Sequence, residues 1–181
     1  MFVDIFDTNI KYDVIYADPP WEYRQSGSKT SSRGMAKQHY DTMSTHEICF
    51  MWATFPNLSE ALKVMKAWGF EYKTAAFVWI KQNKKTDSLF WGMGAYTRAN
   101  AEVCLLGISK NTRAKETVKS HAVHQVIQEP IMKHSKKPYE AIKRIETLVG
   151  GGVRKIELFA REEANDWDCW GNEVLKESQA Q

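Results

Sequence analysis

The sequence has few cysteines and no long apolar run. Its 181 residues include three cysteines, Cys49, Cys104 and Cys169. Their number is odd, they are widely spaced, and the first two lie in apolar segments, so we expect buried, reduced thiols rather than a disulfide framework or a metal site. No apolar stretch approaches the roughly 20 residues that span a bilayer, and the N-terminus lacks the basic start of a signal peptide. These absences predict a cytoplasmic protein with no membrane contact.

A marked excess of one charge sign is also missing. Lys and Arg number 25, Asp and Glu number 22, and the formal net charge is +3, which is too small to indicate a nucleic-acid partner by itself. The basic residues are nevertheless clustered in the segments 80–85, 109–121 and 133–137. Such clusters can contact a phosphate backbone or form ordinary solvated loops, and the composition leaves both interpretations open.

The length and the order of the patterns indicate a single domain, 1–181, of α/β class. Short apolar runs typical of buried strands alternate with segments of helical period, one of which ends at Gly69. The expected strands are 12–17, 49–54, 72–81, 101–109 and 154–159, and the expected helices are 57–69 and 136–149. This order predicts a mainly parallel sheet flanked by helices. Trp52, Trp68 and Trp79 lie in these periodic runs and are expected in the core.

Three irregular segments separate the expected elements: 22–40, 82–99 and 110–125. Polar loops of this length are uncommon in a compact domain and are usually functional or disordered. After the first of them, Ser44 and Glu47 have the spacing of a capping box, which predicts the start of a further helix.

The segment Asp18-Pro19-Pro20-Trp21 follows the first expected strand directly. Two consecutive prolines have no N–H to donate, so they end the strand. An Asp in this place often only caps a turn. The prolines, however, fix the backbone and hold the carbonyls of Asp18 and Pro19 in rigid positions beside a carboxylate. Acceptors of this kind can receive hydrogen bonds from an NH₂ group, and an indole can stack on a planar ring, so the segment predicts a pocket for an aromatic amine such as a nucleobase.

A second strand end carries further polar residues. In an open parallel sheet, ligands bind beyond the carboxyl ends of the strands, near a topological switch point. Residues 18–21 follow one strand end and residues 159–161 follow another. We therefore expect the two segments to meet at one crevice, although almost the whole chain separates them.

The Asp-Pro-Pro-Trp segment resembles the signature of amino-methyltransferases that act on adenine N6. Four further segments, 39–48, 102–111, 134–142 and 154–173, follow in order those of the family that contains the catalytic subunit of the eukaryotic messenger-RNA N6-adenosine methyltransferase and its smaller bacterial and phage relatives. The resemblance covers nearly the whole chain. It implies a Rossmann-like class I methyltransferase fold in the permuted, beta-class motif order, which accounts for the lack of an early Gly-x-Gly-x-x-Gly segment.

The resemblance also implies a cofactor, S-adenosylmethionine, and a set of site residues. The implied catalytic residues are Asp18, Pro19, Pro20 and Trp21. The implied cofactor site comprises Asp18, Lys137, Glu157, Phe159, Arg161, Asn172 and Glu173. The implied substrate contacts are Trp21, Tyr23, His39 and Tyr40. Glu173 stands where the eukaryotic relative has an amide, and Asn100 and Glu102 also lie in a matched segment. No metal is implied, and His121, His124 and His134 are interpreted as loop residues or phosphate contacts.

The implied activity is transfer of a methyl group to the N6 amine of adenine in DNA, with the base flipped out or single-stranded. The same chemistry on RNA is the nearest alternative, and the lack of a zinc finger or another RNA-binding module favours DNA. An inactive partner subunit that binds nucleic acid is a further alternative, although such subunits usually lose the catalytic acid. With no separate target-recognition domain expected, target recognition falls to the three loops, and the small size predicts a homodimer or a partner methyltransferase subunit.

Overall fold

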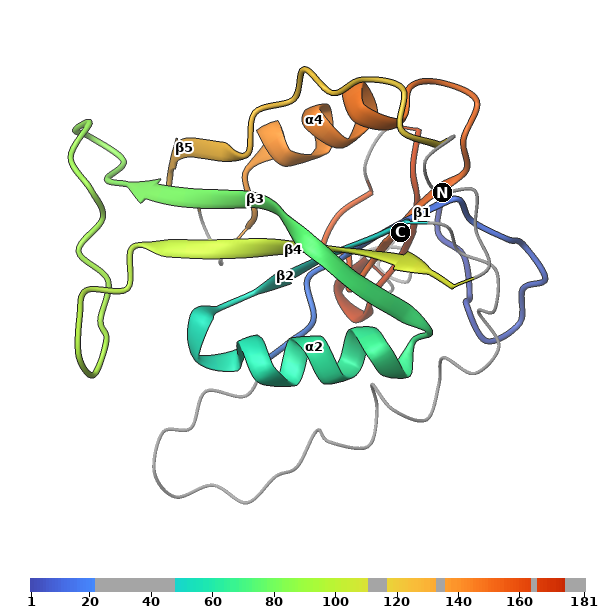
Figure 1. The fold of residues 1–181 in the computed structure, drawn as a ribbon, viewed down its shortest axis with the longest axis horizontal. Coiled ribbons are helices and arrows are strands. Elements are labelled where there is room, and N and C mark those ends of the chain that lie inside the picture. Colours follow the sequence, from blue (N-terminus) through green and yellow to red (C-terminus); the bar gives the residue numbers. More distant parts are fainter. Residues whose placement is uncertain (22–47, 111–116, 133–135, 164–165, 175–181) are drawn as a thin grey trace.

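A seven-stranded sheet runs through the computed structural model of the protein (Figure 1). The structure describes residues 1–21, 48–110, 117–132, 136–163 and 166–174. The strands are β1 (Val14–Ala17), β2 (Ile48–Ala53), β3 (Phe70–Gln82), β4 (Ala101–Ser109), β5 (Val126–Pro130), β6 (Lys155–Leu158) and β7 (Asp168–Trp170). The helices in the described part are the short 3₁₀ helix η2 (Phe55–Asn57), α2 (Leu58–Ala67) and α4 (Tyr139–Val149).

The strand order across the sheet is β5-β3-β4-β2-β1-β6-β7. β1 pairs in parallel with both β2 and β6, β6 pairs in parallel with β7, and β3 pairs in parallel with β5. β4 pairs antiparallel with β2 on one side and with β3 on the other. β4 is therefore the one reversed strand of this sheet, and the other six strands end at the same edge. The α/β class and the mainly parallel sheet predicted from the sequence are confirmed.

Helix α2 covers one face of the sheet and α4 covers the other (Figure 1). Side chains on the central strands alternate between the faces, as the pleat of a strand requires. Ile15 and Ala17 pack in the same cluster as Ala61 and Met65 of α2, whereas the intervening Tyr16 packs in the cluster of α4. Both faces of β1 and β2 are thus buried, which explains why their sequences are almost continuously apolar.

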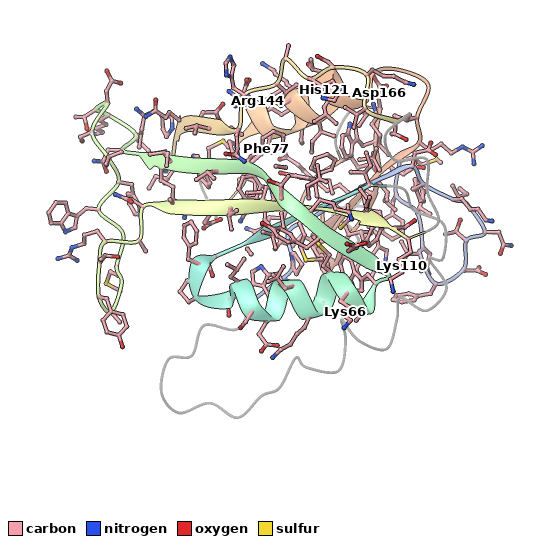
Figure 2. The ribbon with its side chains drawn as sticks, viewed as in Figure 1. Lys66, Phe77, Lys110, His121, Arg144 and Asp166 are labelled. Atoms are coloured by element: carbon pink, nitrogen blue, oxygen red, sulfur yellow. The ribbon has the colours of Figure 1, made fainter. Side chains whose placement is uncertain are left out.

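The α4 face contains most of the large aromatic side chains of the core. Trp52 and Trp79 are 0% and 2% exposed, and their rings pack edge to face at 6.4 Å. Phe77 of β3 lies on the same face (Figure 2) and stacks on Phe50, with 6.2 Å between the ring centroids. Trp68, 5% exposed, packs on the α2 face. The prediction that the tryptophans of the periodic runs belong to the core is confirmed.

The sheet contains two strands that the sequence did not predict. β5 and β7 were not expected, because β5 buries only Ile127 fully and β7 has only three residues, so neither has a readable pattern. β3 is longer than expected and contains two register shifts against β4, between Tyr72 and Thr74 and between Ala75 and Phe77. Such irregularities bend a strand and increase its twist. The predicted helix end at Gly69 is observed, with the glycine at a φ of 84°.

Some of the remaining predictions concern described residues, and others fall outside them. Cys49, Cys104 and Cys169 are free and buried, as predicted. None of the helices among the described residues has the length and apolarity to cross a membrane. The predicted loop 22–40, the capping box of Ser44 and Glu47, and His134 lie outside the described residues, as does part of the loop 110–125.

Candidate active site

Asp18 lies at the topological switch point of the sheet. β1 is flanked by β2 and β6, and along the chain β2 to β5 are added on one side of it and β6 and β7 on the other. Ala17, the last residue of β1, pairs with Leu158, the last residue of β6. The residues that follow, Asp18 and Phe159, therefore leave neighbouring strands at the same edge, where open α/β sheets bind their ligands.

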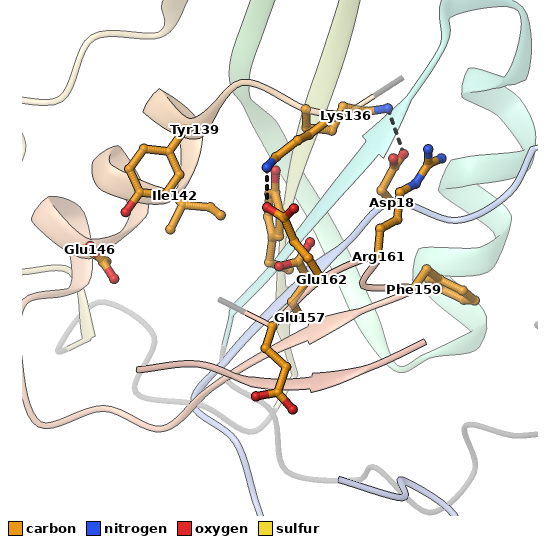
Figure 3. Close-up of a pocket in the computed structure, with 12 residues that line it drawn as sticks. Asp18, Lys136, Tyr139, Ile142, Glu146, Glu157, Phe159, Arg161 and Glu162 are labelled. Atoms are coloured by element: carbon orange, nitrogen blue, oxygen red, sulfur yellow. Dashed lines mark hydrogen bonds and ion pairs between the residues drawn. The ribbon is translucent and has the colours of Figure 1, made fainter. Parts of the chain in front are cut away.

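A pocket of about 250 Å³ opens at this edge (Figure 3). Its lining comes from three places: the end of β1, the end of β6 with the residues after it, and one side of α4 with Lys136 and Lys137 in the segment before it. The lining residues are Tyr16, Asp18, Lys136, Lys137, Tyr139, Ile142, Glu146, Glu157, Phe159, Arg161, Glu162 and Glu163. The structure thus brings together five of the residues assigned by resemblance to the cofactor site: Asp18, Lys137, Glu157, Phe159 and Arg161.

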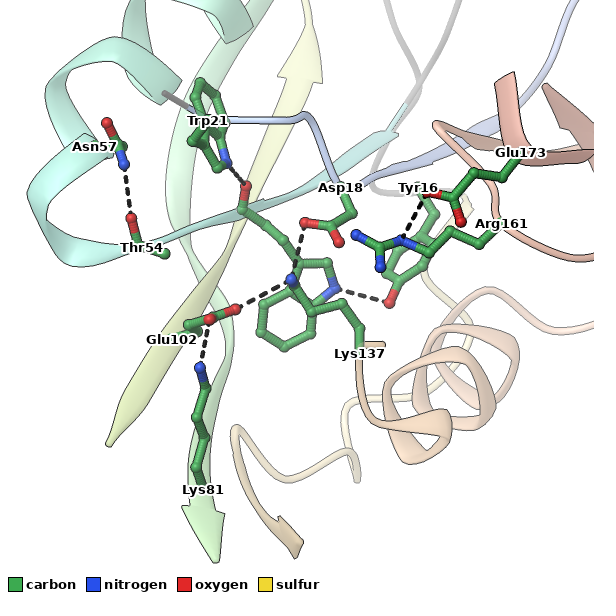
Figure 4. Close-up of polar contacts among 11 residues, drawn as sticks. Tyr16, Asp18, Trp21, Thr54, Asn57, Lys81, Glu102, Lys137, Arg161 and Glu173 are labelled. Carbon is green, nitrogen blue, oxygen red and sulfur yellow. Dashed lines mark hydrogen bonds and ion pairs between the residues drawn. The ribbon is translucent and has the colours of Figure 1, made fainter. Parts of the chain in front are cut away.

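Lys137 connects Asp18 to two further charged residues (Figure 4). Its Nζ lies 2.9 Å from Asp18 Oδ1 and 3.2 Å from Glu102 Oε2, and Glu102 Oε1 accepts a hydrogen bond from Lys81 Nζ at 2.5 Å. The four side chains are between 7% and 18% exposed. They form an alternating chain of charges that runs from the end of β3 through β4 to the end of β1, and we call it the ion chain.

Burial and charge act against each other in the ion chain. Burial raises the pKa of the Asp18 carboxyl above its ordinary value, and Lys137 lowers it in part. Burial also works against the charged form of Lys137, but the carboxylates of Asp18 and Glu102 outweigh it and raise the pKa of the ammonium. Lys137 therefore stays charged at neutral pH and holds Asp18 in a fixed orientation. The ion chain contains two cations and two anions, so the removal of either carboxylate leaves an excess positive charge in a partly buried place.

Glu157 is the second perturbed carboxyl of the pocket. It lies on β6, beside Tyr16 of β1. Burial first, and then the nearby charges of Asp18 and Glu162, raise the pKa of Glu157 from 4.5 to about 7. A carboxyl whose pKa is raised by desolvation in a pocket is typical of a functional site. If the position served stability alone, an uncharged side chain would avoid the cost of burying a carboxyl group.

The backbone is also unusual at Phe159. This residue has a φ of 62°, in the left-handed region that bulky side chains rarely occupy, at a cost of about 1–3 kcal/mol. The conformation turns the chain out of β6 and places the ring against Trp170, with 5.7 Å between the ring centroids. Phe159 lines the pocket, so the strained residue forms part of its wall.

Trp21 anchors the segment after β1 (Figure 4). Its indole N–H donates to the carbonyl of Trp52, at the end of β2, over 2.9 Å, and the indole of Trp52 donates to the hydroxyl of Tyr16 over 2.7 Å. Trp21 is partly buried against the α2 face of the core. Pro19 is buried and Pro20 is exposed. Both ends of Asp18-Pro19-Pro20-Trp21 are thereby fixed, one by Lys137 and the other by the carbonyl of Trp52.

The other residues assigned by resemblance lie at the margin of the pocket or outside the described residues. Asn172 and Glu173 are exposed and do not line the pocket, although Glu173 Oε1 lies 4.0 Å from Nε of Arg161. Tyr23, His39 and Tyr40 lie outside the described residues. Among the residues that the structure does describe, no three His, Cys, Asp or Glu side chains are grouped so that they can hold a metal ion.

Lys81 is the residue that sequence reasoning missed. It belongs to the basic cluster 80–85, which suggested either phosphate contacts or a solvated loop, whereas the structure places it in β3 as the partner of Glu102. Lys136 pairs with Glu162 at the rim of the pocket, but its side chain is 45% exposed, so it stays solvated. A possible signal was the acidic Glu102 within the apolar strand 101–109, because a buried carboxylate requires cations nearby.

Comparison with known proteins identifies the family. A family model described as MT-A70 matches residues 12–173, which include both strand ends and the whole ion chain. The chain belongs to the MT-A70 family. It is 33% identical to the type II methyltransferase M.MunI of a Mycoplasma species over 192 residues, covering 91% of this chain and 78% of the relative. It is 26% identical to a putative N(6)-adenosine-methyltransferase MT-A70-like of Medicago truncatula over 170 residues, covering 91% of this chain and 26% of the relative.

The ion chain predicts a large effect of Glu102 on stability. Glu102→Ala leaves the ammonium groups of Lys81 and Lys137 partly buried without the carboxylate that both contact. We expect a loss of about 3 kcal/mol in the free energy of unfolding, as for one partner of a buried ion pair, measured by urea denaturation. Glu60→Ala breaks the exposed pair with Lys63 on α2 and should cost at most about 1 kcal/mol. Equal losses in the two variants would contradict the central position of Glu102.

The raised pKa of Glu157 predicts that its replacement by Gln increases the stability of the fold, and that this increase grows with pH. The folded protein binds this proton up to about pH 7, whereas the unfolded chain releases it near 4.5. Its stabilisation is fully present below pH 4.5 and is lost as the pH rises through 7. The melting temperature of Glu157→Gln relative to wild type should therefore increase between pH 5 and pH 8. Glu60→Gln, on the exposed face of α2, serves as control. A difference in melting temperature between Glu157→Gln and wild type that does not change with pH would contradict the raised pKa.

Proposed function

We propose that this MT-A70 family protein is an S-adenosylmethionine-dependent methyltransferase that acts on the N6 amine of adenine in DNA. One observation carries the proposal: the Asp18-Pro19 acceptors stand at the topological switch point, and Lys137 joins them to the pocket that contains Glu157 and Arg161. A rigid acceptor pair beside a polar, ligand-sized pocket suits transfer between two bound molecules. One relative is named a methyltransferase and the other a putative methyltransferase, and these names support the same chemistry.

The residues of the pocket fit S-adenosylmethionine in their chemistry. Glu157 can accept hydrogen bonds from ribose hydroxyls, as strand-end acids of Rossmann folds do. Lys137 and Arg161 offer cationic donors for a carboxylate, and Phe159 offers an aromatic face. Glu173 lies 4.0 Å from Arg161, and Asn172 and Glu173 would close the site on that side. When bound, S-adenosylmethionine supplies an electrophilic methyl group on a sulfonium.

Asp18 and Pro19 prepare the amine for attack. The N6 lone pair of adenine is delocalised into the ring, so the amine is a weak nucleophile. If the Asp18 carboxylate and the Pro19 carbonyl each accept one N–H, the nitrogen is drawn toward tetrahedral geometry and its lone pair becomes available. Lys137 contacts Oδ1 of Asp18, so Oδ2 can face the amine. Preorganised acceptors of this kind stabilise the positive charge that develops on nitrogen without reorganising during the reaction.

Aromatic side chains are proposed to bind the base. Trp21 is proposed to stack on adenine, with its indole held by the carbonyl of Trp52, and Tyr23, His39 and Tyr40 remain proposed substrate contacts. An adenine within a duplex cannot reach such a pocket, so it must be flipped out or presented in a single strand. The proposed catalysis therefore depends on holding a displaced base, which positioning and electrostatics can achieve without a covalent intermediate.

The relatives bear on the polymer that carries the adenine. The bacterial relative, of which this chain covers the larger share, is named a type II methyltransferase, and this supports DNA. The plant relative is named a putative N(6)-adenosine-methyltransferase, and this favours RNA as the second candidate. The chain spans about a quarter of the plant relative, so most of that protein has no counterpart in the match.

Asp18→Ala should abolish methyl transfer and leave cofactor binding largely intact. The substitution removes one acceptor for the amine, while Glu157, Phe159 and Arg161 remain in the pocket to bind the cofactor. We expect turnover to fall by at least about 100-fold, as for the loss of one preorganised electrostatic partner. Calorimetry with S-adenosylmethionine would measure binding, and tritiated-methyl transfer would measure turnover. Retained turnover would remove Asp18 from the mechanism, and no binding heat in wild type would refute the cofactor.

The substrate can be tested by tritiated-methyl transfer to DNA and to RNA in parallel, followed by nucleoside analysis. We expect label in N6-methyladenine of DNA. Label in cytosine would refute the adenine assignment, and label in RNA alone would select the second candidate. Asp18→Ala is the matched control in each arm, because it should remove the signal from a true reaction and leave any contaminating activity unchanged.

A further inference from the structure

The β3–β4 loop, residues 83–100, exposes a group of large side chains. Trp91 is 71% exposed, Met93 84% and Tyr96 100%. The loop extends beyond the end of the sheet, to the left in Figure 1, and its side chains project outward from the ribbon in Figure 2. Single exposed apolar residues are common, but several in one short segment indicate a binding surface.

The backbone of the loop fixes this exposure. A Cβ on Gly92 would lie 2.0 Å from the carbonyl oxygen of Ala99, and a Cβ on Gly94 would lie 2.1 Å from that of Thr97. The two halves of the loop tip therefore approach each other more closely than residues with side chains allow. Only glycine fits at these two positions, so the close approach of the two halves sets the backbone course of the tip that carries Trp91, Met93 and Tyr96.

The base of the loop is closed by hydrogen bonds. The N–H of Lys81 donates to the carbonyl of Asn100 over 2.8 Å, and the N–H of Phe90 donates to the carbonyl of Lys81, also over 2.8 Å. Asn83 binds the next turn through its side-chain amide, which donates to Ser88 Oγ at 2.9 Å. These bonds attach the loop tip to the end of β3.

The charges of the loop are those of a surface that meets a polyanion. Lys84, Lys85 and Arg98 are exposed, and Asp87 is the one acid of the segment. The guanidinium of Arg98 lies over the ring of Trp91, 4.9 Å from its centroid. Exposed aromatic rings interleaved with cations suit single-stranded nucleic acid, because the rings stack on bases and the cations contact phosphates. An apolar protein partner would not require the excess of cations.

The loop also lies at the edge of the sheet that contains the candidate active site. Lys81, at its base, binds Glu102, and Glu102 binds Lys137 beside Asp18. All strands except β4 end at this edge. A nucleic-acid strand whose target base enters the pocket at Asp18 can therefore continue over the β3–β4 loop.

We propose that Trp91, Tyr96 and Arg98 form a stacking platform for a base next to the target base in the substrate strand. Trp91 and Tyr96 provide the rings, and Arg98 covers one side of Trp91 and contributes positive charge. The inference rests on the proposed function, since it presumes a nucleic-acid substrate. It adds residues that take part in binding the polymer and take no part in binding the cofactor.

The platform can be tested by fluorescence anisotropy with fluorescein-labelled, adenine-containing 12-nucleotide strands of DNA and RNA. Trp91→Ala and Tyr96→Ala should each weaken binding on the order of 10-fold, the effect of losing one stacked base, and leave the Kd for S-adenosylmethionine unchanged. Arg98→Ala should reduce the dependence of binding on salt by about one phosphate contact. Tyr72→Ala, an exposed aromatic at the other end of β3, is the matched control and should bind as wild type.

The outcomes separate the platform from the proposed function. If wild type binds the strands and the Trp91 and Tyr96 variants bind equally well, the platform is refuted and the proposed function stands. If wild type binds neither strand, the proposed function fails together with the platform. Light scattering gives the mass of each variant, and a wild-type dimer that dissociates in Trp91→Ala would assign the loop tip to a subunit interface and refute the platform.

Discussion

The ammonium group of Lys137, between the carboxylates of Asp18 and Glu102, is the interaction on which the site depends. It joins three parts of the chain that are distant in sequence: the end of β1, the start of β4 and the segment before α4. Burial raises the pKa of the Asp18 carboxyl and so favours its neutral form. Lys137 counteracts this shift in part, and its contact with Oδ1 fixes the orientation of Asp18 before any ligand binds. The cost in stability of burying these charges is consistent with a site selected for its chemistry.

Much of the fold could be predicted from the sequence because its central elements are strongly patterned. β1 and β2 are buried on both faces and read as apolar runs, and α2 and α4 have clear helical periods. β5 and β7 could not be predicted, because pairing with longer neighbours, rather than their own composition, makes them strands. A short segment can complete a sheet with only one buried residue.

The candidate site was predictable to the same extent and for a related reason. Asp18 and Phe159 directly follow strands, and the edge rule for parallel sheets places such residues together. The role of Lys81 was harder to predict, because a lysine within a basic cluster looks solvated. Glu102 in an apolar strand indicates that a cation lies nearby, but only the structure shows that this cation is Lys81. The left-handed conformation of Phe159 also has no sequence signal, since nothing in a phenylalanine indicates strain.

The reversed direction of β4 has a consequence for how such a protein can change. Because β3 and β4 are antiparallel neighbours, the segment between them leaves and re-enters the sheet at adjacent positions. Its length is then free of the geometric demands that a crossover between parallel strands imposes, and lengthening a loop costs little conformational entropy. Insertions here can alter what lies beside the Asp18 pocket while the sheet and the ion chain stay the same. Evolution can thus exchange the outer surface of this edge as a module and keep its chemistry.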